Sequence, residues 1–318
     1  MIIEIFILFA GFIILIKGAD IFVDGASSSA AHFNVSKILI GLTIVAFGTS
    51  APEFAVSIKS ISLGNHDIVL GNVIGSNIMN ILLILGCSSL FHYLSVKSDT
   101  IKKELPFVLL LTSVFAVLLL DSLFNGSISN NFTRSDGIIL FLVFLVFIYY
   151  LVSISLNRKN VLEKEEKKMS LAKSLIFTGL GILMIVFGSD FVVKSASKIA
   201  EILGVSEKMI SLTVVALGTS LPELVTCITA TRKGEYDLAI GNVVGSNIFN
   251  LGIVIGLPIM LFGGVNDVNF NYIDILVMLI SALLLFIFSA NDKKITWREG
   301  LIFLFLFIIY YGYVIVGK

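Results

Sequence analysis

Two short blocks of polar residues lie in the middle of apolar segments, and each block occurs twice in the chain. The first block reads Gly-Thr-Ser-Ala-Pro-Glu over residues 48–53 and Gly-Thr-Ser-Leu-Pro-Glu over residues 218–223. A carboxylate near the centre of a bilayer costs about 2.5 to 3.5 kcal/mol on insertion scales, so two such glutamates require a compensating role. Glu53 and Glu223, each preceded by two hydroxyl side chains, therefore indicate a cation site.

Each of these blocks contains a proline that is expected to kink its helix. Pro52 has no N–H to offer the carbonyl of Gly48, and Pro222 repeats this defect in the second copy. Carbonyls released in the preceding turn, near Ala46 and Phe47 and near Ala216 and Leu217, are tolerated in a membrane only where they line a cavity or meet a cation. Hydroxyls, a carboxylate and loose carbonyls together make a ligand set of hard oxygens.

The second block reads Gly-Asn-Val-Ile-Gly-Ser-Asn-Ile-Met-Asn over residues 71–80 and Gly-Asn-Val-Val-Gly-Ser-Asn-Ile-Phe-Asn over residues 241–250. Its glycines are four residues apart, a spacing that favours close helix packing. Ser76 and Asn80 share one face of a helix, and the second copy has the same pair. Hydrogen bonds between helices also explain these residues when they are taken alone. Beside two glutamates at membrane depth, we interpret them as further ligands.

The types of ligand restrict the ion. Oxygen ligands without a buried histidine or thiolate favour calcium, sodium or magnesium over zinc or copper. Magnesium is disfavoured because it dehydrates reluctantly. Two carboxylates neutralise one divalent ion, whereas the same oxygens divided among several sites suit sodium ions. Cys87 and Cys227 each lie inside an apolar run, so neither a disulfide framework nor a zinc motif is expected.

The segments that carry these blocks are predicted membrane spans. The chain is 57% apolar and only 14% charged, which is too apolar for a soluble fold of its 318 residues. Ten segments have roughly the 17 to 25 apolar residues needed to cross a bilayer, so we expect an all-α polytopic membrane protein with ten transmembrane helices. The predicted spans are 2–24, 37–60, 68–94, 105–121, 137–156, 172–194, 208–231, 238–262, 272–290 and 300–316.

The two copies of each block belong to a long internal repeat. Residues 11–86 align without a gap onto residues 181–256, with about 30 of roughly 75 positions identical. The offset of 170 residues (181 minus 11) contains five spans, an odd number, so equivalent helices must cross the membrane in opposite directions. Inverted repeats are typical of secondary transporters with a site at the midplane; duplication that serves folding alone is the alternative. We predict inverted five-helix repeats over 1–156 and 172–318, joined by a cytoplasmic linker over 157–171.

Basic residues predict how the chain is oriented. If the lysine-rich linker is cytoplasmic, about 15 of the 22 basic residues lie on that side, and both termini are extracellular. The apolar N-terminal segment lacks a basic n-region and a cleavage site, so it is expected to be a first membrane helix of a multi-pass cell-membrane protein. Basic and acidic residues number 22 each, which gives no sign of a nucleic-acid partner. No cofactor and no obligate protein partner are expected beyond the lipid bilayer.

At these two blocks the sequence resembles the prokaryotic type of sodium/calcium exchanger, a branch of the cation/calcium antiporter superfamily. The two alpha repeats of that family carry Gly-Thr-Ser-x-Pro-Glu and then Gly-Asn-x-x-Gly-Ser-Asn, and both motifs occur here in both halves. The resemblance covers essentially the whole chain. It implies an antiporter and not an enzyme, with Na⁺ and Ca²⁺ as substrates, three sodium ions exchanged for one calcium, and long first and sixth helices that slide past a static bundle.

The resemblance also implies a set of ion-binding residues, in which the alanines contribute backbone carbonyls. They are Ala46, Thr49, Ser50, Glu53, Ser76, Asn80, Ala216, Thr219, Ser220, Glu223, Ser246 and Asn250. Some prokaryotic exchangers and the potassium-dependent branch have aspartate at the position of Asn250. Only two acidic ligands are left here, which argues against potassium cotransport.

Three alternative functions fit part of the sequence. A calcium/proton antiporter fits two buried glutamates, which can carry protons, although the many hydroxyl and amide ligands favour sodium. An ion channel that uses the glutamates as a selectivity ring is disfavoured by the inverted repeat within a single chain. An intramembrane hydrolase is disfavoured because these blocks contain no Ser/His pair, no metal-binding histidines and no second carboxylate beside either glutamate.

Overall fold

The computed structural model describes residues 1–62, 66–124, 130–157, 169–205, 216–264 and 271–316. Within these ranges the chain is helical apart from one antiparallel pair of short strands, β1 (Leu94–Ser95) with β2 (Lys294–Ile295). The helices, with η for π-helical segments, are α1 (Ile2–Phe33), α2 (Lys37–Ile40), η1 (Gly41–Val45), α3 (Ala46–Thr49), α4 (Ala51–Ser62), α5 (His66–Met79), η2 (Asn80–Leu85), α6 (Gly86–Phe91), η3 (Thr100–Glu104), α7 (Leu105–Leu119), α8 (Asp121–Phe124), α9 (Arg134–Asn157), α10 (Leu171–Ile202), α12 (Ala216–Thr219), α13 (Leu221–Arg232), α14 (Tyr236–Phe249), η5 (Asn250–Ile255), α15 (Gly256–Phe262), α16 (Tyr272–Asp292) and α17 (Trp297–Val316).

The predicted spans coincide with these helices wherever the chain is described. Among the described residues, seven helices are long and apolar enough to cross a bilayer, and the bent run from α2 to α4 makes an eighth if its two parts are counted as one span. The predicted span 105–121 is α7, which begins at the predicted residue and ends two residues early, because Leu120 leaves the helical conformation with φ −104° and ψ 44°. The predicted span 208–231 begins within 206–215, outside the described residues, and continues as α12 and α13. Most of the predicted linker, over 158–168, also lies outside the described residues.

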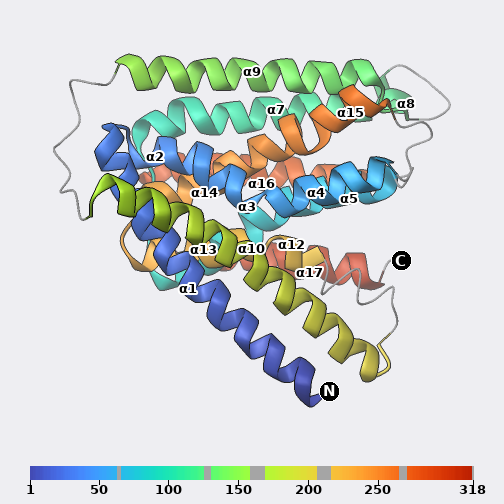
Figure 1. The fold of residues 1–318 in the computed structure, drawn as a ribbon. Helices are drawn as coiled ribbons and strands as arrows, with labels where there is room; N and C mark the ends of the chain where they lie inside the picture. Colours follow the sequence, from blue (N-terminus) through green and yellow to red (C-terminus); the bar gives the residue numbers. More distant parts are fainter. Residues whose placement is uncertain (63–65, 125–129, 158–168, 206–215, 265–270, 317–318) are drawn as a thin grey trace.

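Helices α1 and α10 lie side by side and antiparallel (Figure 1). Gly11 of α1 faces Val192 of α10, whereas Gly25 faces Thr178. A Cβ atom on Gly18 would lie 2.7 Å from a side-chain atom of α10, so the two backbones are almost in contact. Because α1 and α10 are equivalent helices of the two repeats, their opposite directions confirm that the repeat is inverted.

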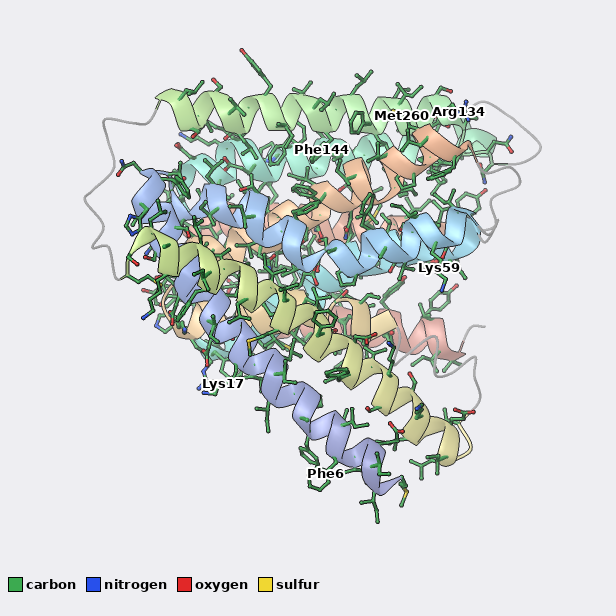
Figure 2. All side chains as sticks on the ribbon, viewed as in Figure 1. Phe6, Lys17, Lys59, Arg134, Phe144 and Met260 are labelled. Carbon is green, nitrogen blue, oxygen red and sulfur yellow. The ribbon has the colours of Figure 1, made fainter. Side chains whose placement is uncertain are left out.

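The helices that carry the polar blocks lie at the centre of the bundle. In Figure 1, α7 and α9 form one side, α1 and α10 form the opposite side, and α3, α4, α5, α13 and α14 lie between them. The spans that contain α5 and α14 are the most buried, whereas only 22% of the apolar span in α1 and 17% of that in α17 is buried. Figure 2 shows Phe6 on the part of α1 that extends away from the bundle, where this side chain is 77% exposed. The outer helices therefore present apolar surface suited to lipid.

Candidate functional site

The helix that carries each glutamate is broken just before it. Ser50, between α3 and α4, has φ −82° and ψ 6°, and Ser220, between α12 and α13, has φ −90° and ψ 4°, so neither residue is helical. The helical parts on either side of Ser50 diverge by 47°. The kinks predicted from Pro52 and Pro222 are thus confirmed. They place each glutamate in the first turn of a new helix, where the helix dipole favours negative charge.

The backbone carbonyl of Ala46 is less free than the sequence predicted. It accepts the N–H of Ser50 at 3.0 Å, so the expectation that the kink releases this carbonyl from helical bonding is wrong. The helix bends at Ser50, whose own N–H still reaches Ala46, so the kink does not break this hydrogen bond. A carbonyl has two lone pairs, so one can still face an ion. Ala216 begins α12 directly after the undescribed residues 206–215, and the role of its carbonyl stays a prediction.

In the second half, a side chain of α10 satisfies the carbonyl that the proline leaves without a donor. Pro222 has no N–H for the carbonyl of Gly218, and the Ser189 hydroxyl donates to that carbonyl at 2.9 Å. Ser189 is 4% exposed. The position equivalent to Ser189 in the first half is Ala19, which has no hydroxyl to offer the carbonyl of Gly48. The two breaks are therefore supported differently.

Glu53 and Glu223 lie where the two halves meet, and each is 1% exposed. Hydroxyl groups from the opposite half reach both carboxyl groups. The Ser50 Oγ atom lies 3.1 Å from Oε1 of Glu223, and the Thr219 hydroxyl hydrogen-bonds Glu53. The hydroxyl groups around the two carboxyl groups belong to Thr49, Ser50, Ser76, Thr219 and Ser246.

The asparagines that end the second block are held by a reciprocal pair of amide hydrogen bonds. Asn80 and Asn250 begin the π-helical segments η2 and η5, and each is 1% exposed. The Asn80 Nδ2 atom donates to Asn247 Oδ1 at 2.9 Å, and the Asn250 Nδ2 atom donates to Asn77 Oδ1 at 3.0 Å. The two bonds are equivalent under the 170-residue offset, because Asn80 corresponds to Asn250 and Asn77 corresponds to Asn247. Both terminal amides therefore use their N–H groups on a neighbouring helix.

Among the described residues of the two blocks, four buried carboxyl and amide oxygens have no hydrogen-bond partner. They are Oε2 of Glu53, Oε2 of Glu223, Oδ1 of Asn80 and Oδ1 of Asn250. Each half contributes one carboxylate and one amide oxygen from equivalent positions. Buried acceptors without donors are costly, more so when two of them carry charge, unless a cation compensates them. The described residues include no group of three or more His, Cys, Asp and Glu side chains that could bind a metal, so hydroxyl and amide oxygens must complete any coordination.

The structure brings most of the predicted residues together and adds four that the sequence analysis did not assign. Ser220 is 3% exposed and its Oγ atom has no hydrogen-bond partner, as expected of a residue near the site. The additional residues are Asn77, Asn247, Asn242 and Ser189. Identity between the repeats was a signal for the first three, and Asn242 also lies four residues before Ser246, on the same helix face. Ser189 gave no such signal because its equivalent is alanine.

Comparisons with known proteins agree on one family. The family model described as sodium/calcium exchanger protein matches residues 3–153 and 173–316. The inner membrane protein YrbG of Escherichia coli is 37% identical over 272 residues, covering 82% of this chain and 81% of its own length. The sodium/calcium exchanger MaX1 of Methanosarcina acetivorans is 31% identical over 337 residues, covering 96% of each chain.

Solved structures give the same result for the fold. The sodium-calcium exchanger NCX_Mj, soaked with 10 mM Na⁺ and 10 mM Sr²⁺, superposes with a TM-score of 0.85 and is 33% identical in sequence. The match covers 98% of this chain and 98% of that chain. The likeness thus extends over both halves, including the helices that carry the two polar blocks.

Proposed function

This chain belongs to the sodium/calcium exchanger family, and we propose that it exchanges sodium for calcium at the site between its two halves. Membership makes it an all-helical, multi-pass membrane protein and a cation/calcium exchanger, not an enzyme. The observation that carries the choice of ions is the set of four unpartnered oxygens, two from carboxyl groups and two from amides. Such oxygens suit calcium, and divided among several sites they suit sodium.

The proposed ligands are the twelve residues of the two blocks. Two carboxyl groups supply the charge, hydroxyl and amide oxygens supply further coordination, and two backbone carbonyls complete the set. The residues are Ala46, Thr49, Ser50, Glu53, Ser76, Asn80, Ala216, Thr219, Ser220, Glu223, Ser246 and Asn250. Burial of both glutamates and the unpaired amide oxygens support this assignment.

The proposed stoichiometry is three sodium ions for one calcium ion. Two ionised glutamates carry two negative charges, which one calcium ion cancels. Three sodium ions leave the loaded site with one net positive charge, so each exchange cycle moves charge across the membrane. Calcium and sodium would compete for the same oxygens, which is the condition that antiport requires.

The proposed arrangement places two inverted five-helix repeats, 1–156 and 172–318, on either side of a cytoplasmic linker over 157–171. Both termini then face the extracellular side of the cell membrane. Among the described connections that would be cytoplasmic, Lys97 pairs with Asp237 and Lys37 pairs with Glu235, so basic residues gather at this end of the bundle. This placement follows the rule that lysine and arginine concentrate on the cytoplasmic side.

The test is sodium-driven calcium flux in proteoliposomes. Purified protein is reconstituted into vesicles loaded with sodium, and calcium-45 uptake is started by dilution into sodium-free medium. We expect uptake that requires the outward sodium gradient and saturates with calcium. Vesicles with equal sodium on both sides and an imposed pH gradient test the calcium/proton alternative. Uptake that follows the pH gradient and ignores sodium would contradict the proposed coupling.

A further inference from the structure

The reciprocal hydrogen bonds between asparagines cross from one half of the protein to the other. Asn77 of α5 accepts a hydrogen bond from Asn250, the first residue of η5. Asn247 of α14 accepts one from Asn80, the first residue of η2. Asn77 and Asn247 are each 2% exposed, so water does not compete for these bonds. Neither residue is among the twelve proposed ligands.

A backbone contact determines which end of the Asn77 amide faces Asn250. The Asn77 Nδ2 atom donates to the backbone carbonyl of Asn247 at 3.3 Å, and a carbonyl can only accept. Asn77 Oδ1 is therefore the atom that faces Asn250, and Asn250 must answer with its Nδ2 donor. The Oδ1 atom of Asn250 is left without a protein partner.

We propose that Asn77 and Asn247 are positioning residues, which turn the amide oxygens of Asn250 and Asn80 toward the ion. The proposal rests on the proposed function, since it assigns those two oxygens to ion binding. It adds that each half of the protein orients a ligand of the other half.

The experiment is a double-mutant cycle on the apparent calcium affinity, measured as the calcium concentration that gives half-maximal sodium-driven flux in proteoliposomes. Asn250→Ala and Asn77→Ala are each expected to raise this concentration, by about tenfold or less for Asn77→Ala. The double variant should be no worse than Asn250→Ala alone, because Asn77 acts through Asn250. As the control, Asn77→Ala combined with Ser50→Ala should multiply the single effects, since Ser50 contacts Glu223 and Ser246 and shares no hydrogen-bond partner with Asn77 in the described structure.

The mirror cycle, Asn247→Ala with Asn80→Ala, provides an independent repeat, and thermal unfolding in detergent identifies variants that fail to fold. Multiplying effects in both reciprocal cycles would overturn the proposal, as would failure of both Asn77→Ala and Asn247→Ala to fold. An unchanged calcium response in Asn77→Ala, with a weakened response in Asn250→Ala, would overturn the positioning role and leave the exchange function intact. An unchanged response in Asn250→Ala would instead remove that residue from the ligand set.

Discussion

Glu53 and Glu223 are surrounded by hydroxyl groups and lie 1% exposed, so each carboxylate depends on the bound ion for charge compensation. We expect Glu53→Gln and Glu223→Gln each to abolish calcium transport. A calcium ion would keep one uncompensated charge in a medium of low dielectric constant, at a cost of about 3 to 5 kcal/mol. Calcium-45 flux in proteoliposomes measures the effect, and Glu201→Gln, at an exposed position of α10, is the control. Wild-type exchange in either buried variant would contradict the site.

Asn250 offers a second test at the residue scale. Asn250→Asp adds a third carboxylate, which binds a proton as the pH falls and then competes with the cation. We expect calcium transport by this variant to fall more steeply than that of the wild type between neutral and mildly acidic pH, or to become sensitive to potassium. Asn77 Oδ1 lies 3.0 Å from the amide nitrogen that this substitution removes, so some loss of transport is expected even at neutral pH.

The control for Asn250→Asp is Asn80→Asp, which makes the same change in the first half. If neither acid nor potassium alters transport by Asn250→Asp beyond the wild-type response, position 250 does not belong to the ion site. The glutamates were predictable from the sequence because a charge at membrane depth is costly. The orienting asparagines were not, because only the three-dimensional packing of α5 against α14 and η5 shows where their amides point.

At the scale of helices, the contact between α10 and the break before Glu223 leads to a testable expectation. Ser189→Ala leaves the carbonyl of Gly218 buried without a donor, which costs about 1 to 3 kcal/mol. We expect a lower thermal unfolding temperature in detergent together with slower exchange, because the break positions Glu223. Ser174→Ala is the control, since that hydroxyl bonds only the carbonyl of Leu171 in its own helix. Equal effects of the two substitutions would show that the carbonyl contact has no special role.

The two halves differ in how tightly their equivalent helices pack. Gly241 and Gly245 of α14 are buried, and a Cβ atom on Gly245 would lie 2.6 Å from the Cβ of Ala46. The equivalent glycines of α5 are less buried, and Gly71 is exposed. With the proposed orientation, the tighter packing lies toward the cytoplasmic side and the looser packing toward the extracellular side.

At the proposed cytoplasmic end, ion pairs connect α1 and α2 to the segment between α13 and α14. Glu235, which is 8% exposed, accepts from Ser27 of α1 at 2.9 Å and pairs with Lys37 of α2 at 2.8 Å. Lys233 also pairs with Asp24 of α1 at 2.9 Å. The connection between α13 and α14 is thereby tied to α1, one of the two helices that the family resemblance implies are mobile.

We expect Glu235→Gln to loosen this end of the bundle. Loss of a largely buried ion pair worth about 1 to 2 kcal/mol should make amide hydrogen exchange roughly 5- to 30-fold faster at the start of α14. Mass spectrometry of peptides covering 233–242 measures the rate. Asp190→Asn is the control, because its partner Lys194 lies on the same helix and both side chains are exposed. An unchanged rate of amide hydrogen exchange in Glu235→Gln would show that these ion pairs do not hold the cytoplasmic end of the bundle together.

The proline kinks were predictable because proline removes a backbone donor wherever it sits in a helix. The order and approximate limits of the spans were predictable from apolar length. The early end of α7 was not, because a window of apolar residues does not reveal that Leu120 leaves the helical conformation. The asymmetry between α5 and α14 was also hidden, since their sequences are nearly the same and only the packing differs.

At the scale of the whole molecule, the proposed stoichiometry makes exchange sensitive to voltage. One net charge moved through the full membrane potential gains or loses about 2.3 kcal/mol per 100 mV. We expect an inside-negative potential to accelerate sodium entry and calcium exit. Calcium flux at fixed sodium gradients, with potassium and valinomycin setting a potential of either sign, measures the response. Flux that ignores the potential would indicate two sodium ions per calcium and would leave the two-glutamate site unaffected.

The inverted architecture could be predicted from the repeat offset and the odd number of spans between the copies. That prediction needed no knowledge of packing, because parity alone reverses the second half. The contact between α1 and α10 could not be predicted in the same way. It depends on glycines that meet across two helices far apart in the sequence.

The reciprocal asparagine contacts have the geometry of an isologous interface, in which one pair of positions meets twice around a two-fold axis. Asn250 is the equivalent of Asn80 and Asn247 is the equivalent of Asn77, so a homodimer of single repeats would make these same two bonds. In a homodimer, any substitution would alter both bonds at once. Here each half is encoded separately, and the halves already differ: Ser189 occupies the position that is equivalent to Ala19. One chain can therefore give its two half-sites different chemistry on a common scaffold.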